Sequence, residues 1–227
     1  ITATALALSS GDGDPERAVI LVSCDLVAIP NGLLEAVRAR VMALLPELDP
    51  HSVFLNGTHT HTAPELRLDD DIRHMGGGIS ASGMGLTLPT LDPAHYVAFA
   101  ADRIAGAAVE AWRARRPGAI GFGLGHAVVG RNRRSAYYGG ESRMYGNTRD
   151  ARFSHIEGYE DHSVNILATW DTGGALTGLV LNVASPSQVS EHQFQLSADY
   201  WHDTRVELRR RLGSGVFVLP QCAAAGD

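Results

Sequence analysis

The sequence predicts an α/β fold in which mixed β-sheets are flanked by helices. Segments with the period of amphipathic helices mingle with short apolar segments typical of strands along all 227 residues, and no internal repeat is present. A chain of 227 residues is long enough for one large domain or two small ones, and the mingling favours one. Because the chain opens inside a strand and stops directly after another, we expect residues 1–227 to be part of one domain cut at both ends.

The first two predicted strands form a hairpin. Residues 1–8 and 17–27 have the composition of strands, and the Gly- and Asp-rich sequence 9–15 between them is typical of a turn. Within the second strand, the apolar sequence at 18–22 (AVILV) has no polar residue. Such a strand is expected to be covered on both of its faces.

A helix and a third strand follow. Asn31 is predicted to be the N-cap of a helix over 32–45, which Pro46 ends, and residues 52–55 then form a strand. We expect the helix to place its apolar residues on one face, namely Leu34, Val37, Val41, Leu44 and Leu45.

Residues 67–91 show no periodicity but contain an acidic run and a glycine-rich sequence, so we expect either a rim or lid over a site or a plain surface insertion. A long amphipathic helix then covers 94–115, with Asp92 as N-cap and Pro93 at the first helical position. The next predicted strand is 119–129. Its alternate glycines indicate a backbone that another group approaches closely.

The sequence GRNRRSAYY at 130–138 places arginines beside tyrosines. Guanidinium groups hold anions and carbonyl oxygens through paired donors, although a solvated charge cluster is an equally good interpretation. Residues 149–161 are expected to form another loop.

The last elements are a hairpin, a helix and a strand. Residues 163–170 and 175–183 form the hairpin, and the sequence SAD then caps a helix that reaches Leu212 and stops at Gly213. Residues 216–219 are the final strand. We expect the first strand and the last two strands to be antiparallel to their neighbours.

Composition excludes several functions. The net charge of −6 gives no reason to expect nucleic acid or an anionic membrane surface as a partner. All 19 basic residues are arginine, which excludes Schiff-base and P-loop chemistry based on lysine. Cys24 and Cys222 are too few and too distant for a disulfide framework and are expected to be thiols at strand ends. The sequence contains neither a signal peptide nor a run long enough to span a bilayer.

The strongest candidate site follows the third strand, where the sequence LNGTHTHTAPE at 55–65 turns from apolar to polar. In an extended backbone His59 and His61 point to the same face, so both rings can approach one metal ion or one substrate atom. Neutral imidazole is the commonest transition-metal ligand, and two such rings make half of a zinc site. The alternative is a pair of solvated or hydrogen-bonded loop histidines.

Several short sequences, taken in order, resemble the neutral/alkaline, non-lysosomal ceramidase family. NGTHTHTAP at 56–64 is similar to the family segment THTHSGP, and GRNRRSAY at 130–137 is similar to the loop NRSPSAY. GLVLNVA at 178–184 resembles GVLNWFAVHGT, SAD at 197–199 corresponds to SSD, and AGD at 225–227 corresponds to the start of GDVSPN. The resemblance therefore covers nearly the whole chain.

This resemblance implies a ceramidase-like zinc amidohydrolase, with Zn²⁺ as cofactor and an N-acyl compound, such as N-acylsphingosine, as substrate. It implies that His59 is a zinc ligand and that His61 is a second ligand or an acid/base group. Arg133 would bind a carbonyl or headgroup, and Asp199 would belong to the catalytic residues. Contact with a membrane would be peripheral at most.

The sequence departs from the family at one zinc ligand. The family histidine in FAVHGT aligns near Ser185, and Glu191 or His192 is the nearest replacement. We favour Glu191, because a carboxylate is an ordinary third zinc ligand beside two histidines, and a surface pair is the alternative. The serine of GDVSPN would lie beyond Asp227. A metal-dependent hydrolase of another soluble amide or ester, or a non-catalytic domain with this fold, therefore remains a competing interpretation.

Overall fold

The computed structural model describes residues 1–64, 66 and 92–225, so the expected lid at 67–91 and the final Gly-Asp lie outside it. The strands and helices follow in the order β1 (Ala3–Ser9), β2 (Ala18–Cys24), α1 (Asn31–Leu44), β3 (Val53–Gly57), α3 (Pro93–Arg113), β4 (Gly118–His126), β5 (Arg134–Tyr137), β6 (Glu141–Met144), β7 (Phe153–Ile156), β8 (Ser163–Asp171), β9 (Leu176–Val183), α4 (Tyr200–Leu212) and β10 (Phe217–Cys222). Two 3₁₀ turns lie at Pro15–Arg17 and Pro50–Ser52.

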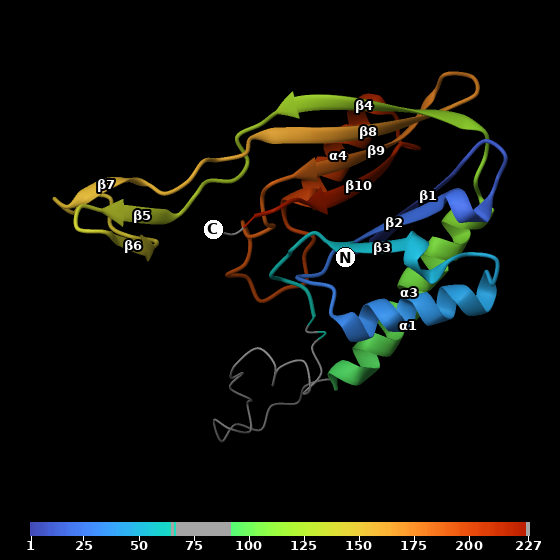
Figure 1. Cartoon of the computed structure of the whole chain (residues 1–227), viewed down its shortest axis with the longest axis horizontal. Helices are drawn as coiled ribbons and strands as arrows, with labels where there is room; N and C mark the ends of the chain where they lie inside the picture. Colours follow the sequence, from blue (N-terminus) through green and yellow to red (C-terminus); the bar gives the residue numbers. More distant parts are fainter. Residues whose placement is uncertain (65, 67–91, 226–227) are drawn as a thin grey trace.

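Two sheets are stacked between helices (Figure 1). The first has the order β1-β2-β3 and is covered by α1 and α3, and the second has the order β10-β9-β8-β4 and is covered by α4. Between the sheets Leu6 packs with Val180 and Leu219. Both sheets mix parallel and antiparallel pairs, which confirms the predicted α/β fold with mixed sheets flanked by helices.

The predicted strand 18–22 is covered on both faces, as expected. Ile20 and Val22 of β2 belong to the core under α1 and α3, whereas Leu21 faces the second sheet. A strand buried on both faces cannot alternate apolar and polar residues, which explains its uninterrupted apolar sequence.

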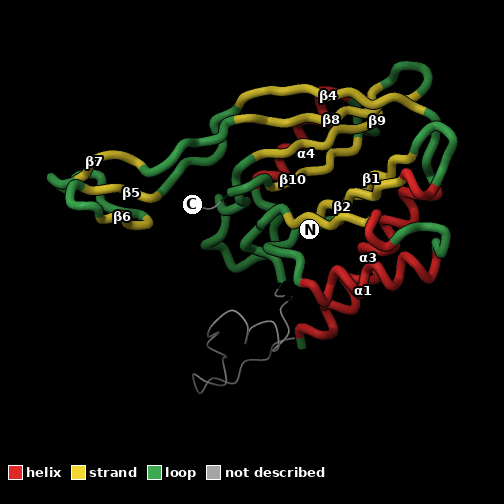
Figure 2. The backbone as a smooth tube through the Cα atoms, viewed as in Figure 1, coloured by secondary structure: helices red, strands yellow, loops and turns green. Residues whose placement is uncertain are grey.

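Two β-α-β units direct the strand ends to one edge of the molecule. The chain passes from β2 through α1 to the parallel strand β3, and from β9 through α4 to the parallel strand β10. The side-chain amide of Asn56 at the end of β3 donates to the carbonyl of Cys222 at the end of β10, at 3.4 Å. Figure 2 shows the loops that follow these strands gathered at this edge. Active sites commonly lie at such an edge.

The prediction that the last strand is antiparallel to its neighbour was wrong. Helix α4 connects the end of β9 to the beginning of β10, so β10 runs parallel to β9. As expected, β1 pairs antiparallel with β2, and β9 pairs antiparallel with β8.

Of the predicted helix caps, Asp92, Asp199 and Gly213 are confirmed and Asn31 is wrong. The carboxylate of Asp92 accepts from the N–H of Ala94 at 2.9 Å, and Gly213 ends α4 with φ of 120°. In α1, however, Asn31 is already helical and Pro30 occupies the N-cap position without a side-chain hydrogen bond. Leu44 is also 52% exposed, because the buried face of α1 is formed by Leu33, Val37 and Val41.

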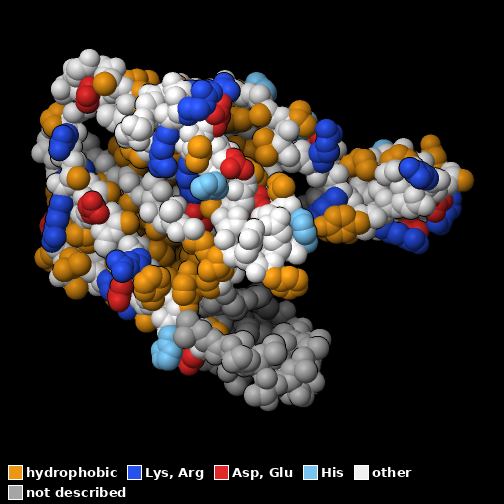
Figure 3. All heavy atoms as spheres, turned by 180° about the vertical axis from the view of Figure 1, so that it is seen from behind, with side chains coloured by type: hydrophobic (Ala, Val, Ile, Leu, Met, Phe, Trp, Pro, Cys, Tyr) orange, Lys and Arg blue, Asp and Glu red, His pale blue; other side chains and the backbone are white. Residues whose placement is uncertain are grey.

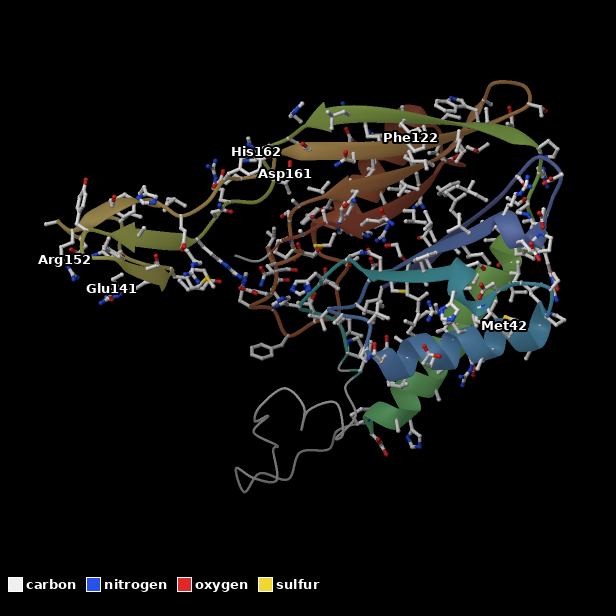
Figure 4. The ribbon with its side chains drawn as sticks, in the orientation of Figure 1. Met42, Phe122, Glu141, Arg152, Asp161 and His162 are labelled. Atoms are coloured by element: carbon white, nitrogen blue, oxygen red, sulfur yellow. The ribbon has the colours of Figure 1, made fainter. Side chains whose placement is uncertain are left out.

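The segment after β4 forms a projecting arm that the sequence did not predict. β5, β6 and β7 make a separate antiparallel sheet, although a loop was expected at 149–161. Strands of four residues are too short to show an alternation. Near the tip, Arg152 lies 3.5 Å from Glu141 (Figure 4), and seen from behind the arm carries arginine beside hydrophobic side chains (Figure 3).

The glycines of β4 allow a close approach, as predicted. A Cβ on Gly121 would lie 3.0 Å from the ring of Trp170 on β8. The alternate positions of β4 carry exposed apolar side chains, including Phe122 (Figure 4). Cys24 and Cys222 are free thiols at the ends of β2 and β10. Within the described residues, no helix combines the length and apolar character needed to cross a membrane.

Candidate functional site

The threonines of the sequence THTHT anchor the loop after β3. Thr58, Thr60 and Thr62 are buried, and the last two donate hydrogen bonds to the carbonyl of Ser197, at 2.9 and 3.1 Å. The hydroxyl of Ser187 donates to the carbonyl of Thr58 at 2.7 Å. The loop is therefore fixed through alternate residues to the segments before α4 and after β9, and the histidines between them are left facing the site.

The two histidine rings lie together. The ring centroids of His59 and His61 are 5.0 Å apart with an interplanar angle of 64°. The expected extended backbone was wrong, because β3 ends at Gly57 and His59 has φ of 61°. The rings converge because the anchored threonines and this left-handed residue turn them to the same side.

Glu191, from a distant part of the sequence, contacts His61. Its Oε2 lies 3.2 Å from Nδ1 of His61. The side-chain amide of Gln188 lies 3.1 Å from Nε2 of His61 and donates to Oε2 of Glu191 at 3.1 Å. Sequence reasoning gave Gln188 no role, although its position after the end of β9 was the available signal. The alternative candidate, His192, is exposed.

The donor types at this edge suit zinc, since two imidazoles and one carboxylate are ordinary zinc ligands. Nevertheless, among the residues that the structure describes, no group of three or more His, Cys, Asp or Glu side chains is arranged to hold a metal ion. The carboxylate of Glu191 instead contacts a ring nitrogen of His61. The described residues thus contribute donors of the right chemistry but do not themselves form a closed coordination site.

Arg133 lies beside a pocket next to the histidines. Its Nη1 donates to the hydroxyl of Tyr145 at 2.5 Å, and its guanidinium carbon lies 5.1 Å from the centroid of the Tyr145 ring. The pocket has a volume of about 230 Å³ and is lined by Val129, Gly130, Arg131, Arg133, Ser185, Pro186, Gln188, Val189 and Tyr200.

Asp199 holds the segment that carries Gln188 and Glu191. Its carboxylate accepts from the N–H of Val189 at 3.2 Å and from the N–H and hydroxyl of Ser190 at 2.7 and 2.6 Å. Burial favours a raised pKa for Asp199, but the hydrogen bonds from Ser190 and neighbouring backbone outweigh it and hold the pKa below its usual value. These contacts make Asp199 a positioning residue, and its predicted catalytic part stays a prediction.

Three residues in or next to the candidate site have a left-handed backbone. Among the described residues, the non-glycine residues with positive φ are His59, Tyr145 and Asp199, at 61°, 52° and 54°. Such conformations persist only where surrounding contacts impose them, and they gather at functional sites. Each of the three lies in the site or holds one of its residues.

A buried ion pair between Arg205 and Asp25 lies next to the loop that follows β3. Nη1 and Nη2 of Arg205 on α4 donate to the two carboxylate oxygens of Asp25, after β2, at 3.0 and 2.8 Å. The same carboxylate accepts from the N–H and hydroxyl of Thr2, both at 2.9 Å. The hydroxyl of Thr58, the residue before His59, lies 3.5 Å from Oδ1 of Asp25.

Removal of the Asp199 carboxylate should loosen the segment 188–191. We expect Asp199→Ala to lower the free energy of unfolding by about 1–3 kcal/mol, because the variant loses a helix cap and hydrogen bonds to a charged group and places alanine at a φ of 54°. Hydrogen exchange of the amides of Val189 and Ser190 should accelerate. Asp203→Ala, in the first turn of the same helix, is the control. Unchanged exchange at Val189 and Ser190 in Asp199→Ala would contradict this positioning role.

Burial and neighbouring charges together set the pKa of His61. Its pKa is lowered chiefly by partial burial and also by His59 and Arg133, whereas Glu191 acts in the opposite direction. The ring therefore stays neutral to lower pH than an ordinary histidine. We expect Arg133→Gln to raise this pKa and Glu191→Gln to lower it in the metal-free protein, measured by NMR of the imidazole protons. Arg149→Gln, at an exposed arginine, should leave it unchanged, and a lower pKa in Arg133→Gln would contradict this reading.

Comparison with solved structures, but not comparison of sequences, identifies similar proteins. No protein-family model matches the sequence, and no curated protein matches it significantly. The structure is similar to that of neutral ceramidase from Pseudomonas aeruginosa, with a TM-score of 0.67, 22% identity, and coverage of 99% of this chain and 33% of that chain. It is also similar to a ceramidase complexed with C2, with a TM-score of 0.60, 21% identity, and coverage of 90% and 29%.

The chain therefore spans about a third of the length of these solved structures. At this level of identity the likeness establishes the fold. The resemblance drawn from the short sequences is confirmed at that level: over nearly its whole length, the chain has the fold of a segment of neutral ceramidase.

Proposed function

We propose that the protein is a ceramidase-like, zinc-dependent hydrolase that cleaves an N-acyl amide bond, and that these residues form part of its catalytic domain. The observation that carries the proposal is that His61 contacts both His59 and Glu191 at the strand-end edge of a fold shared with neutral ceramidase. The likeness to ceramidases supports hydrolysis of an amide, and the donor types support zinc.

His59, His61 and Glu191 would hold the metal, together with groups from the remainder of a longer protein. Zinc bound there would lower the pKa of a water molecule to about 7 and polarise the substrate carbonyl. For Glu191 to reach the ion, its carboxylate must leave the ring nitrogen of His61, which it contacts at 3.2 Å. Gln188 contacts both side chains and can keep them oriented during that change.

The other residues bind and orient the substrate. The guanidinium of Arg133, held by Tyr145, can donate paired hydrogen bonds to a carbonyl oxygen in the adjoining pocket. His61, if it is not a ligand, is neutral at physiological pH and can accept a proton from the attacking water. Asp199 keeps the segment 188–191 in place.

Arg133→Gln should raise KM or lower kcat without removing zinc, because guanidinium binds carbonyl oxygens and is not a metal ligand. We expect kcat/KM to fall by roughly 10- to 100-fold, the effect of losing a hydrogen bond to a charged group. Kinetics and metal content of the full-length variant check this. Unchanged kinetics would show that the arginines at 131–134 form a solvated charge cluster and do not bind the substrate.

The proposal is tested by hydrolysis of a panel of N-lauroyl amides by the full-length protein, before and after treatment with a chelator. We expect hydrolysis that the chelator abolishes and added zinc restores. Hydrolysis that is insensitive to the chelator would exclude a metal-dependent reaction. No hydrolysis of any amide, in zinc-loaded protein, would favour a non-catalytic domain with this fold.

A further inference from the structure

The first sheet covers only part of the inner face of the second sheet. On that face Leu219 of β10 lies opposite Val180 of β9. Val180 in turn lies opposite Leu167 of β8, and Leu167 lies opposite Phe122 of β4, so the four side chains form one row across the sheet. Leu219 and Val180 are buried with Leu6 of β1, Leu167 is half-buried, and Phe122 is 81% exposed. The cover that β1 provides therefore ends before it reaches β4.

The uncovered part of the second sheet is apolar. Ile120, Phe122 and Leu124 alternate with glycines along β4, so they point to the same face, and all three are exposed (Figure 4). Large exposed apolar patches on soluble proteins mark surfaces that another group covers. The row on β4 is therefore expected to face a further layer of the protein.

The strand of the first sheet that borders this gap has an open edge. In the part of the chain that the structure describes, β1 pairs with β2 alone. In Figure 1 the strands follow in the order β3, β2, β1, β10, β9, β8, β4, so the open edge of β1 is directed toward the uncovered part of the second sheet. Free edges are usually protected by charges, proline or a bulge. β1 has the sequence ATALALS and an uninterrupted register with β2, so it has none of these.

The hydrogen-bond pattern identifies the backbone groups at this open edge. The N–H of Asp25 donates to the carbonyl of Thr2 at 2.9 Å, and at the other end of the pair the N–H of Ser10 donates to the carbonyl of Arg17 at 3.3 Å. Because hydrogen-bonded residues alternate along an antiparallel pair, the even-numbered residues of β1 bond to β2. The residues whose N–H and carbonyl groups point to the open edge are Ala3, Ala5, Ala7 and Ser9.

We infer that a β-strand from outside residues 1–227 of the same protein pairs with the open edge of β1 and covers the apolar row on β4. Neighbouring strands of a sheet lie about 4.8 Å apart, so an added strand extends the first sheet over the part of the second sheet that β1 leaves uncovered. The chain covers only 33% and 29% of two solved structures with this fold, so a longer protein can supply the strand. Buried on both faces, the strand should be apolar throughout. This inference does not depend on the proposed reaction.

A second copy of this chain fits the edge less well. In a symmetric dimer two β1 strands would pair antiparallel about a twofold axis perpendicular to the sheet, and both second sheets would then lie on the same side. In each copy β8 and β4 extend beyond β1, so these strands of the two copies would occupy the same space. A strand of the longer protein avoids this overlap.

Photocross-linking of the full-length protein tests the cover over β4. With p-benzoylphenylalanine in place of Phe122, we expect an intramolecular cross-link to a peptide outside residues 1–227. The control carries the same group in place of Phe99, which is exposed on α3, and should not capture that peptide. A cross-link of Phe122 to a second copy, or to no peptide outside residues 1–227, would overturn the inference.

Hydrogen exchange of the full-length protein tests the pairing with β1 and requires no substitution. The amide of Leu6 bonds to β2, whereas the amides of Ala5 and Ala7 are protected only if another strand pairs with the open edge. We expect the amides of Ala5 and Ala7 to exchange at rates within about tenfold of that of Leu6. Exchange more than about tenfold faster than that of Leu6 would overturn the pairing, even if Phe122 is covered.

Discussion

Replacing His59 by alanine in the full-length protein is expected to abolish zinc binding and amide hydrolysis while leaving the fold intact. Loss of one ligand is severe, because the remaining groups cannot close a tetrahedral site. The fold should persist because His59 is in a loop beyond the end of β3 and is not part of a core cluster. Metal analysis and circular dichroism measure the two effects.

The backbone at His59 requires a second variant, because φ of 61° disfavours alanine. Asparagine tolerates this conformation, so His59→Asn should lose zinc without backbone strain. His51→Ala, at an exposed histidine before β3, is the control and should retain zinc. Full zinc occupancy and activity in both His59 variants would show that the metal assignment is wrong.

Breaking the buried ion pair should give the largest loss of stability. We expect Arg205→Met to lower the free energy of opening of α4 and the end of β2 by about 3–5 kcal/mol, because it leaves Asp25 charged, buried and without its guanidinium partner. Asp25 is fully buried and Arg205 is 6% exposed. Hydrogen exchange of peptides from α4 and β2 measures this opening.

The control lies on the same helix. Arg210 pairs with the exposed Glu207, so Arg210→Met removes an equivalent charge where water screens it and should change exchange little. Because Thr58 contacts the carboxylate of Asp25, Arg205→Met should also accelerate exchange of the loop that holds His59. Equal effects of the two substitutions on hydrogen exchange would show that the buried ion pair stabilises the fold no more than the exposed one.

The sequence correctly predicted helix ends that are determined by neighbouring residues. Asp92 followed by Pro93 predicted the start of α3, and Gly213 predicted the end of α4. Asn31 failed as a cap because Pro30, which prefers an extended conformation, took the position before the helix. The sequence did not predict the arm for another reason. Its strands have only four residues each, and their pairing cannot be recognised from the sequence of any one strand.

The candidate site was predicted in part. The position of polar residues at strand ends indicated that His61 and Glu191 meet. They are 130 positions apart in the sequence, and the fold brings Nδ1 of His61 to 3.2 Å from Oε2 of Glu191. That rule does not specify which side chain of a polar segment points inward, so Gln188 was overlooked. The left-handed backbone at His59 depends on the anchored threonines, which only the folded chain reveals.

The most direct test of the zinc proposal is anomalous X-ray diffraction, at the zinc absorption edge, from crystals of the full-length protein prepared with zinc. We expect a peak about 2.0–2.1 Å from a ring nitrogen of His59, with His61 or Glu191 also in the coordination shell. A zinc peak elsewhere, or none at His59 while the site is fully ordered, would contradict the account.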